Sequence, residues 1–442
     1  MINFINEFSN KFIEETRNKK IQIISHFDTD GITSASIITK TLERLENHFS
    51  TKIIKSLSTE EINNLPKDKI IIMLDIGSGN IEQLALSNKK IFIIDHHEIS
   101  INKIPENISI LNPHLINEEN LCTAELSYLF SKSISQNNKD LAYLAVLGMV
   151  GDVMEKNLNL IKNQIIKDSN IIIKKGLLIY PSTRPLDRAL EFSSKPFIPG
   201  ITGNLSGTYK LLNDINIKKI GKKYKALIDL NEEEMKDLTT TVALKLAPNE
   251  ITNYIGNLYL IKLFNKIEDA REISAMINAC SRMGESQTAL LFCLGNSKAR
   301  KKAEKIYMKY KQLIISGLKY IEKNKNIIGN DYIIINARDN IKDTIIGTLA
   351  SILSFSSSYK QGTVIIAMAY NKDKIKVSAR IVDFNNDSTR NLKKLMDSIT
   401  KNLGQGNSGG HKKAAGCIIN IEKENEFIEL IKKEFEYELI KI

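Results

Sequence analysis

The sequence has no tryptophan, and only four of its 442 residues are cysteines. These are Cys122, Cys280, Cys293 and Cys417. They form no Cys-x-x-Cys pair, which argues against a zinc cluster and a disulfide framework and fits a reducing cytoplasm. No apolar run approaches the ~20 residues needed to cross a bilayer, and residues 1–16 lack the apolar core of a signal peptide. We therefore expect a soluble, cytoplasmic protein without membrane contact.

Composition places the chain among ordinary globular proteins, with 42% hydrophobic and 26% charged residues. At about 150 residues per domain, the length predicts two or three domains. There are 62 lysines and arginines against 51 acids, a formal charge of +11. Such a balance favours a polyanionic partner such as nucleic acid, although a compositionally biased genome produces the same excess.

The first half of the chain repeats one pattern: a short β-branched run, a loop rich in acids or glycine, and a helical stretch. The β-branched runs lie at 21–24, 70–74 and 91–94, a helical pattern covers 33–45, and an apolar helix is expected over 141–150. Apolar strands that alternate with helices predict a parallel sheet covered on both faces. Ligands bind at the carboxyl ends of such strands, so the polar residues that follow them are expected to share one crevice.

The second half is expected to begin after an irregular connection, because four of the eight prolines lie between positions 181 and 199. Residues 200–325 are expected to be mainly helical and basic, with lysines gathered at 218–225 and 298–311. Strand patterns return at 332–336, 363–368 and 374–379, with a helix at 343–354, and they precede a glycine-rich stretch at 404–416 and an amphipathic C-terminal helix. These shifts predict three domains, over residues 1–200, 201–325 and 326–442.

Three of the six histidines follow the strand patterns together with several aspartates. The candidate residues are His26, His96, His97, Asp28, Asp30, Asp75, Asp95 and Asp152. Unpaired carboxylates in a buried crevice cost on the order of several kcal/mol each, so cations are needed to neutralise them. Mixed imidazole and carboxylate ligands suit manganese or magnesium better than a cysteine-rich zinc site. Two such ions suit phosphoester hydrolysis.

The order of these clusters resembles the DHH phosphoesterase superfamily, which is named after the Asp-His-His found here at 95–97. HFDTDG at 26–31, LDIGSG at 74–79 and GMVGDV at 148–153 are similar to its other motifs. The His-x-Asp-x-Asp-Gly spacing resembles the RecJ branch. Within that branch, the stretches at 111–114, 179–203 and 277–284 look like the archaeal RecJ-like nucleases, so the resemblance covers nearly the whole chain.

The resemblance implies an α/β fold with three parts: an N-terminal DHH domain whose parallel sheet is flanked by helices, a helical basic middle region, and a smaller α/β DHH-associated nucleotide-binding domain. It also implies two divalent cations, manganese before magnesium. One would be held by His26, Asp28 and Asp75, and the other by Asp30, Asp75, His96 and Asp152. Asp75 would bridge the ions, His97 would face the substrate phosphate or assist the leaving oxygen, and Asp95 would support the histidines.

A second motif, GGHKKAAG at 409–416, follows KVSAR at 376–380. Alone, it is better explained as a glycine-rich strand connection, but the pair resembles the DHH-associated domain. The resemblance implies that a nucleotide is gripped by Arg380, Ser378, Gly409, Gly410 and His411. Arg184 and Arg188 lie beside the proline-rich loop. They are two further candidates for phosphate contact, because a guanidinium suits bidentate recognition of a phosphate.

The function implied is a metal-dependent single-strand exonuclease, a two-metal phosphodiesterase that releases mononucleotides from DNA or RNA in replication or repair. The basic middle region would line a path for the strand. Two alternatives stay open. One is a scaffold of the replicative helicase that binds GINS and MCM, as in the eukaryotic relative of RecJ, whose acidic motifs have decayed. The other is a phosphodiesterase for oligoribonucleotides or cyclic dinucleotides. The motifs do not distinguish polarity, DNA from RNA, or the oligomeric state.

Overall fold

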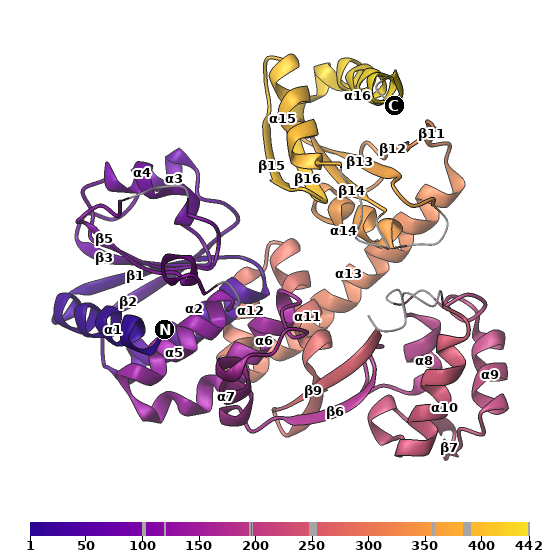
Figure 1. The fold of residues 1–442 in the computed structure, drawn as a ribbon, viewed down its shortest axis with the longest axis horizontal. Helices are drawn as coiled ribbons and strands as arrows, with labels where there is room; N and C mark the ends of the chain where they lie inside the picture. The colour runs from indigo at the N-terminus through magenta and orange to yellow at the C-terminus, as the bar shows by residue number, and fades with distance from the viewer. Residues whose placement is uncertain are drawn as a thin grey trace. The chain divides into compact units, whose positions relative to one another are not determined.

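The computed structural model of the chain describes residues 1–99, 103–118, 121–193, 196, 198–246, 254–355, 359–382 and 390–440. The chain forms two compact units, whose elements are labelled in Figure 1. Unit 1 consists of Met1–Gly176, Tyr180–Thr183 and Gly256–Tyr307, and unit 2 of Leu177–Ile179, Arg184–Ile255 and Met308–Ile442. None of the helices within the described ranges combines the length and apolar character that a membrane crossing requires.

Unit 1 is built on a five-stranded sheet with the order β2-β1-β3-β4-β5, and every pairing in it is parallel. Its strands are β1 (Lys20–His26), β2 (Phe49–Ile54), β3 (Lys69–Leu74), β4 (Ile91–Ile94) and β5 (Ile108–Leu111). The predicted parallel sheet is therefore confirmed. Strands β1, β3 and β4 have neighbours on both sides and are covered on both faces, which is why they appear in the sequence as continuous apolar runs.

Successive residues of β3 enter two different cores, because side chains of a strand alternate between its faces. Ile70, Ile72 and Leu74 pack with α1 (Ile2–Thr16), α2 (Thr29–Arg44) and α5 (Thr123–Ile134). Ile71 and Met73 pack on the opposite face with α3 (Thr59–Asn63) and α4 (Ile81–Ala85). Figure 1 shows these two groups of helices on opposite sides of the sheet.

The rest of unit 1 contains a second, three-stranded sheet with the order β10-β9-β6. The strands of this sheet are β6 (Ile172–Leu177), β9 (Ile255–Leu263) and β10 (Lys266–Asp269). The same part of the chain contains the helices α6 (Ala142–Gly151), α7 (Leu160–Asp168), α11 (Ala270–Arg282), α12 (Ser286–Cys293) and α13 (Ser297–Lys323), and α13 continues into unit 2. Strands β9 and β10 lie within the stretch predicted to be mainly helical. The pattern missed them because the buried run of β9, residues 258–261, is too short to be told from a buried helix.

Unit 2 contains a six-stranded sheet with the order β11-β12-β13-β14-β16-β15, in which only β12 and β13 pair in parallel; its strands are labelled in Figure 1. The strands are β11 (Ile327–Ile328), β12 (Tyr332–Asn336), β13 (Val364–Asn371), β14 (Lys374–Ile381), β15 (Asn407–His411) and β16 (Ala414–Asn420). Helices α15 (Leu392–Asn402) and α16 (Glu424–Ile440) share its main core, and α14 (Asp343–Ser354) contacts β13 and β14. The helix predicted over 343–354 is α14, and the predicted α/β fold is confirmed.

The segment Arg184–Ile255 of unit 2 is made of short elements. Its described residues include α8 (Leu186–Glu191), α9 (Leu205–Asp214), β7 (Lys219–Ile220), β8 (Lys223–Tyr224) and α10 (Glu232–Ala243). Strands β7 and β8 pair in an antiparallel hairpin.

Helices α5 and α7 are joined by a buried carboxylate, that of Asp168 at the end of α7. Tyr128 Oη donates to Asp168 Oδ2 at 2.7 Å, Gln164 Nε2 donates to Oδ1 at 2.9 Å, and Lys132 Nζ donates to Oδ2 as well. Burial acts to raise the pKa of Asp168, but the hydrogen bonds from Lys132, Tyr128 and Gln164 outweigh it and lower the pKa to about 2. The ionised carboxylate therefore stabilises the folded state.

We predict that Asp168→Asn lowers the free energy of unfolding by about 2 kcal/mol near neutral pH, since each pKa unit corresponds to about 1.4 kcal/mol. A depressed pKa contributes stability above the unfolded value of 3.8, and this contribution disappears as the pH falls towards about 2. Urea unfolding across this pH range measures the difference. Asp214→Asn, at the exposed end of α9, is the matched control. A loss for Asp168→Asn that does not shrink at acidic pH would contradict the prediction.

Candidate metal centre

The turn from β1 into α2 carries three of the predicted site residues. His26 is the last residue of β1, and Asp28 caps α2 by accepting a hydrogen bond from Gly31 N at 3.0 Å. The sequence predicted this helix from residue 33, but it begins at Thr29 because the cap satisfies the first turn. The earlier start places Asp30 in that turn, where its side chain is fully buried.

The other site residues follow β3, β4 and α6. Asp75 comes directly after β3 with a left-handed φ of 58°, which is uncommon for aspartate. Asp95, His96 and His97 come directly after β4, and Asp152 ends α6. Because β1, β3 and β4 are parallel neighbours, their carboxyl ends meet at one edge of the sheet.

The structure brings these side chains into one cluster, in which three groups each have ligand atoms within 4.8 Å of one another. The groups are His26, Asp28 and Asp75; Asp30, His96 and Asp152; and Asp75, His96 and His97. His26 Nδ1 lies 3.0 Å from Asp28 Oδ2 and 3.1 Å from Asp75 Oδ2. His96 Nε2 lies 3.3 Å from Asp152 Oδ2 and 3.6 Å from Asp75 Oδ1. The two oxygens of Asp75 thus approach different histidines.

Asp95 orients the two histidines that follow it through hydrogen bonds. Its Oδ1 accepts hydrogen bonds from His97 Nδ1 at 2.7 Å and from His96 N at 2.8 Å, and its Oδ2 accepts one from Ser78 N at 3.0 Å. Burial acts to raise the pKa of Asp95, but the hydrogen bond and charge of His97 outweigh it and lower the pKa. Asp95 therefore stays ionised and orients His97.

Sequence reasoning missed the residues at the start of α5. The backbone N–H groups of Thr123 and Ala124 both donate to Asp30 at 2.8 Å, and Thr123 Oγ1 donates to Asp75 Oδ1 at 3.1 Å. Asp30 is held by backbone groups, so the identities of Thr123 and Ala124 convey little of that contact, whereas Asp75 is held by the hydroxyl of Thr123. The only signal in the sequence is Glu125, whose position predicts a helix start at this point.

The cluster has a large unfavourable charge in the absence of cations. Burial, and then the charges of Asp28, Asp30, Asp95 and Asp152, raise the pKa of Asp75 well above its usual range. Burial, followed by Asp30 and Asp28, raises the pKa of Asp152 to about 9. Within the described part of the chain, these carboxylates form ion pairs only with histidines. Oxygen and imidazole donors with this excess of negative charge fit divalent cations of the manganese and magnesium type.

Helix α11 supports the first residue of α2, Thr29, which lies between Asp28 and Asp30. Asn278 Oδ1 accepts a hydrogen bond from Thr29 N at 3.1 Å, and Thr29 Oγ1 donates to Ser274 O at the same distance. Asn278 lies in the stretch 277–284, which is more than 240 residues away along the chain. It is therefore a positioning residue for the two acids on either side of Thr29.

We predict that Asn278→Ala weakens metal binding or turnover by about 10-fold, the size typical of partners that orient metal ligands. The expected signature is a higher manganese concentration at half-maximal activity. Ser281→Ala, a buried change on the same helix, is the control. If Asn278→Ala lowers stability but leaves the manganese dependence unchanged, the residue has only a structural role.

The predicted nucleotide-binding residues lie together on adjacent strands of unit 2. Two rows of paired residues run across β14, β16 and β15. The first row is Ser378, Gly416 and Gly409. The second row, two residues further along β14, is Arg380, Ala414 and His411. Gly410 lies between these two rows. A Cβ on Gly416 would lie 2.4 Å from Val377 O, so only glycine fits there. Arg380 Nε donates to Ser351 on α14 at 2.9 Å, while His411 is exposed.

The remaining two predicted phosphate contacts are Arg184 and Arg188, which lie in the segment Arg184–Ile255. They belong neither to the cluster of aspartates and histidines nor to the predicted nucleotide-binding residues on β14 and β15. Both are exposed, and Arg188 Nη1 forms an ion pair with Glu191 at 2.9 Å. Their contact with a substrate stays a prediction.

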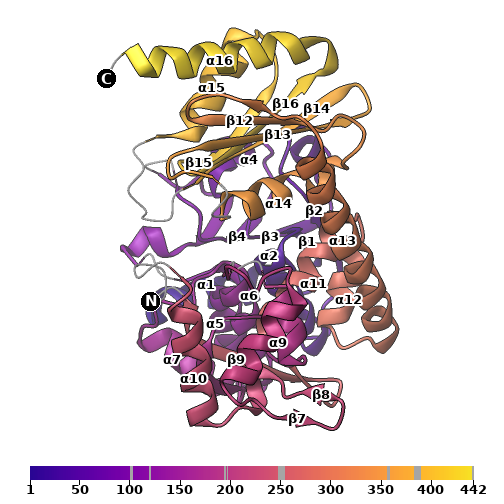
Figure 2. The same cartoon turned by 90° about the vertical axis from the view of Figure 1, so that its right-hand side faces the viewer.

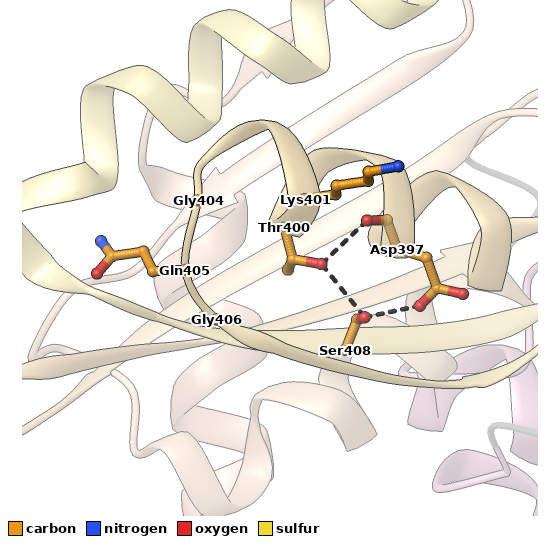
Figure 3. A pocket seen from close by; sticks show the side chains of 7 residues that line it. All are labelled: Asp397, Thr400, Lys401, Gly404, Gln405, Gly406 and Ser408. Atoms are coloured by element: carbon orange, nitrogen blue, oxygen red, sulfur yellow. Dashed lines mark hydrogen bonds between the residues drawn. The ribbon is translucent and has the colours of Figure 1, made fainter.

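A shallow hollow of about 520 Å³ lies between the end of α15 and β15 (Figure 3). Three of its polar side chains bind one another: Ser408 Oγ donates to Asp397 Oδ1 at 2.6 Å, and Thr400 Oγ1 donates to Ser408 Oγ at 3.3 Å. Because these groups are satisfied, we assign no ligand to it.

Three family models match the chain in succession. Residues 20–149 match the DHH family, N-terminal domain, residues 179–254 match the DHH-CID domain, and residues 329–436 match the DHHA1 domain. An uncharacterized protein of Methanocaldococcus jannaschii is 29% identical over 428 residues, which cover 93% of this chain and 92% of that protein.

Solved structures share the fold over nearly the whole chain. RecJ from Thermus thermophilus, in complex with Mn²⁺, superposes with a TM-score of 0.59 at 17% identity and covers 98% of this chain. The chain spans about half of that protein, 54% of its length. CDC45 from Entamoeba histolytica superposes with a TM-score of 0.69 at 13% identity, covering 97% of this chain and 98% of CDC45. The chain therefore belongs to the DHH superfamily, with a DHH, a DHH-CID and a DHHA1 domain in that order, and its fold is similar to those of RecJ and CDC45.

Proposed function

We propose that this protein is a metal-dependent exonuclease that hydrolyses terminal phosphodiesters of single-stranded DNA or RNA to mononucleotides, in DNA replication or repair. The observation that carries the proposal is the pair of donor groups described above, one around His26 and Asp28 and one around Asp30 and Asp152, with Asp75 between them. Two divalent ions held in this way suit attack on a phosphorus centre.

The residues divide into ligands and supports. His26, Asp28 and Asp75 would hold one cation, and Asp30, Asp75, His96 and Asp152 the other, with manganese as the first candidate and magnesium as the second. When bound, such ions lower the pKa of a coordinated water and stabilise charge on the phosphate oxygens. The α2 cap, Thr123 and Ala124 hold the ligand oxygens in place through hydrogen bonds.

His97 is our candidate for direct contact with the substrate. Its Nδ1 donates to Asp95, so Nε2 is the atom left to donate to a phosphate or leaving oxygen. The side chain is 48% exposed, whereas that of Asp75 is 2% exposed. This difference supports a role towards the substrate for His97 and a role as a buried ligand for Asp75.

In unit 2, we propose that Arg380 and His411 hold the nucleotide that is removed. Ser378 and Gly409 lie in one row of the sheet, and Gly410 lies between that row and the row of Arg380 and His411. The two glycines have no side chains, which lets a phosphate approach the backbone. Arg184 and Arg188 remain candidates for further phosphate contacts.

The test is incubation of the purified protein with manganese and four strands, DNA and RNA each labelled at either end. Release of labelled mononucleotides supports the proposal, and the label that appears first gives the polarity. Absence of release, or undiminished release by Asp75→Ala, would refute it. Dinucleotides are assayed beside the strands, because turnover of dinucleotides alone would instead indicate a phosphodiesterase for small oligoribonucleotides or cyclic dinucleotides.

A second candidate is a scaffold role in the replicative helicase, with GINS and MCM as partners. It is favoured by the similarity in fold to CDC45, which extends over 98% of that protein. A scaffold needs no metal, so the test is recovery of purified GINS and MCM by the immobilised Asp75→Asn protein. Failure to recover either would argue against this role.

A further inference from the structure

The hairpin of β7 and β8 lies in one of the two strongly basic short segments of the chain, the other being the start of α13. Residues 209–225 contain six lysines and one aspartate, a net charge of +5, whereas the whole chain of 442 residues has a net charge of +11. Four of these lysines, Lys218, Lys219, Lys222 and Lys223, are exposed on or beside the hairpin. We call these four residues the lysine hairpin; its strands are labelled in Figure 2.

The lysine hairpin is held in place by aromatic contacts. Tyr224 of β8 stacks on Tyr209 of α9 with ring centroids 5.8 Å apart, and its hydroxyl donates to Asn213 Oδ1 at 3.1 Å. Lys219 Nζ lies 4.9 Å from the centroid of the Tyr224 ring and 5.5 Å from that of Tyr209. These contacts order the backbone, so the lysines lose less entropy when they bind a ligand.

The charges of the lysine hairpin are not neutralised within the described residues, where no carboxylate forms an ion pair with any of its four lysines. The basic run on α13 differs. There, Arg300 pairs with Glu268 and Glu304, and Lys302 pairs with Glu285. The hairpin is therefore the better of the two clusters for an external anion.

We propose that the lysine hairpin binds the sugar-phosphate backbone of a nucleic-acid strand without sequence preference. The nature of the strand rests on the proposed function. Lysine supplies point charges that suit phosphates and lacks the planar fork used to read guanine. Ile220, which is 65% exposed, is the one large apolar side chain exposed on the hairpin. A protein interface with an apolar core, or insertion into a lipid surface, needs more apolar area than this.

The test is binding of a fluorescent single strand to the full chain in the presence of a chelator, which prevents cleavage. Fluorescence anisotropy is measured over a range of salt concentrations for the unaltered protein and for Lys218→Gln/Lys222→Gln/Lys223→Gln. Lys219 is kept because it contacts the tyrosines. Each lost phosphate contact lowers the salt slope by about 0.7 on a single strand, so we expect a decrease of about 2 and an affinity at least about 10-fold weaker at low salt.

The matched control is Lys11→Gln/Lys19→Gln/Lys20→Gln, which removes the same charge. These lysines are exposed, and Lys19 and Lys20 lie at the amino end of β1, opposite the carboxylate cluster. Equal losses in both triple variants, or no loss in the hairpin variant, would overturn the proposal. The proposal would also be overturned if the hairpin variant lost binding to anionic lipid vesicles but bound the single strand as tightly as the unaltered protein.

The two proposals can fail separately. Release of mononucleotides from the labelled strands by the unaltered protein with manganese is measured in parallel, because this hydrolysis is the activity that the exonuclease proposal requires. If hydrolysis is absent but strand binding depends on the hairpin, the exonuclease proposal fails and the binding site stands. If hydrolysis is present and the hairpin variant binds strands as tightly as the unaltered protein, the binding site fails.

Discussion

Asp75→Asn is expected to lower hydrolysis by about 10⁴-fold, the largest effect of any single change in the chain, because one side chain is shared by both proposed cation sites. Its Oδ2 lies beside His26 and its Oδ1 beside His96. An amide keeps the shape but removes the charge and one of the two anionic oxygens. Both ions should therefore bind more weakly, and single-turnover assays over a range of manganese concentrations measure the loss.

The same change should stabilise the metal-free protein. Burial and four neighbouring acids raise the pKa of Asp75, so an uncharged amide relieves repulsion in the folded state. We expect the melting temperature without metal to be unchanged or higher, and the increase caused by manganese to be smaller than in the unaltered protein. Asp68→Asn is the matched control, because Asp68 is exposed at the opposite end of the same strand, β3. An unaltered manganese response of Asp75→Asn would contradict its place in the metal centre.

Gly148→Ala is expected to have the second-largest effect, a loss of about 3 kcal/mol in the free energy of unfolding. A Cβ at Gly148 would lie 2.3 Å from Ala124 Cβ and 2.7 Å from Asp30 Oδ1. Helices α2, α5 and α6 pack against one another at this point, so no single side chain can move aside to make room. The displacement would also separate Asp30 from the backbone donors of α5.

Urea unfolding and manganese titration measure the two consequences of Gly148→Ala. Gly79→Ala is the control, because a Cβ there meets no atom within 4 Å. A variant that unfolds like the unaltered protein would show that α6 can shift without cost. In that case, the close approach of the three helices would not explain why glycine occupies position 148.

Much of the metal centre could be predicted because its residues follow the strongest local signals in the chain. Each of Asp75 and Asp95 comes directly after a continuous apolar run, and such runs indicate buried parallel strands. Once the strands are parallel, topology alone brings their ends together. Asp152 was found in a similar way, since it ends the apolar helix α6.

The supporting contacts could not be predicted, because they depend on backbone groups and on distant parts of the chain. Thr123 and Ala124 act mainly through their N–H groups, which every residue except proline possesses. Asn278 reaches Thr29 from a helix that follows the whole DHH-CID match. Strands β9 and β10 were missed because short apolar runs fit strands and buried helices equally well.

The sequence by itself determined the parallel sheet, the acids and histidines at its edge, and their likeness to the DHH superfamily, because each of these is written in local hydrophobic periodicity and short motifs. Only the tertiary structure decided which atoms face one another. Distances between His26, Asp75 and His96, and the donors that α5 and α11 provide, arise from packing among segments that are far apart in the chain. Such packing depends on the combined shape of many side chains, which no single stretch of sequence specifies.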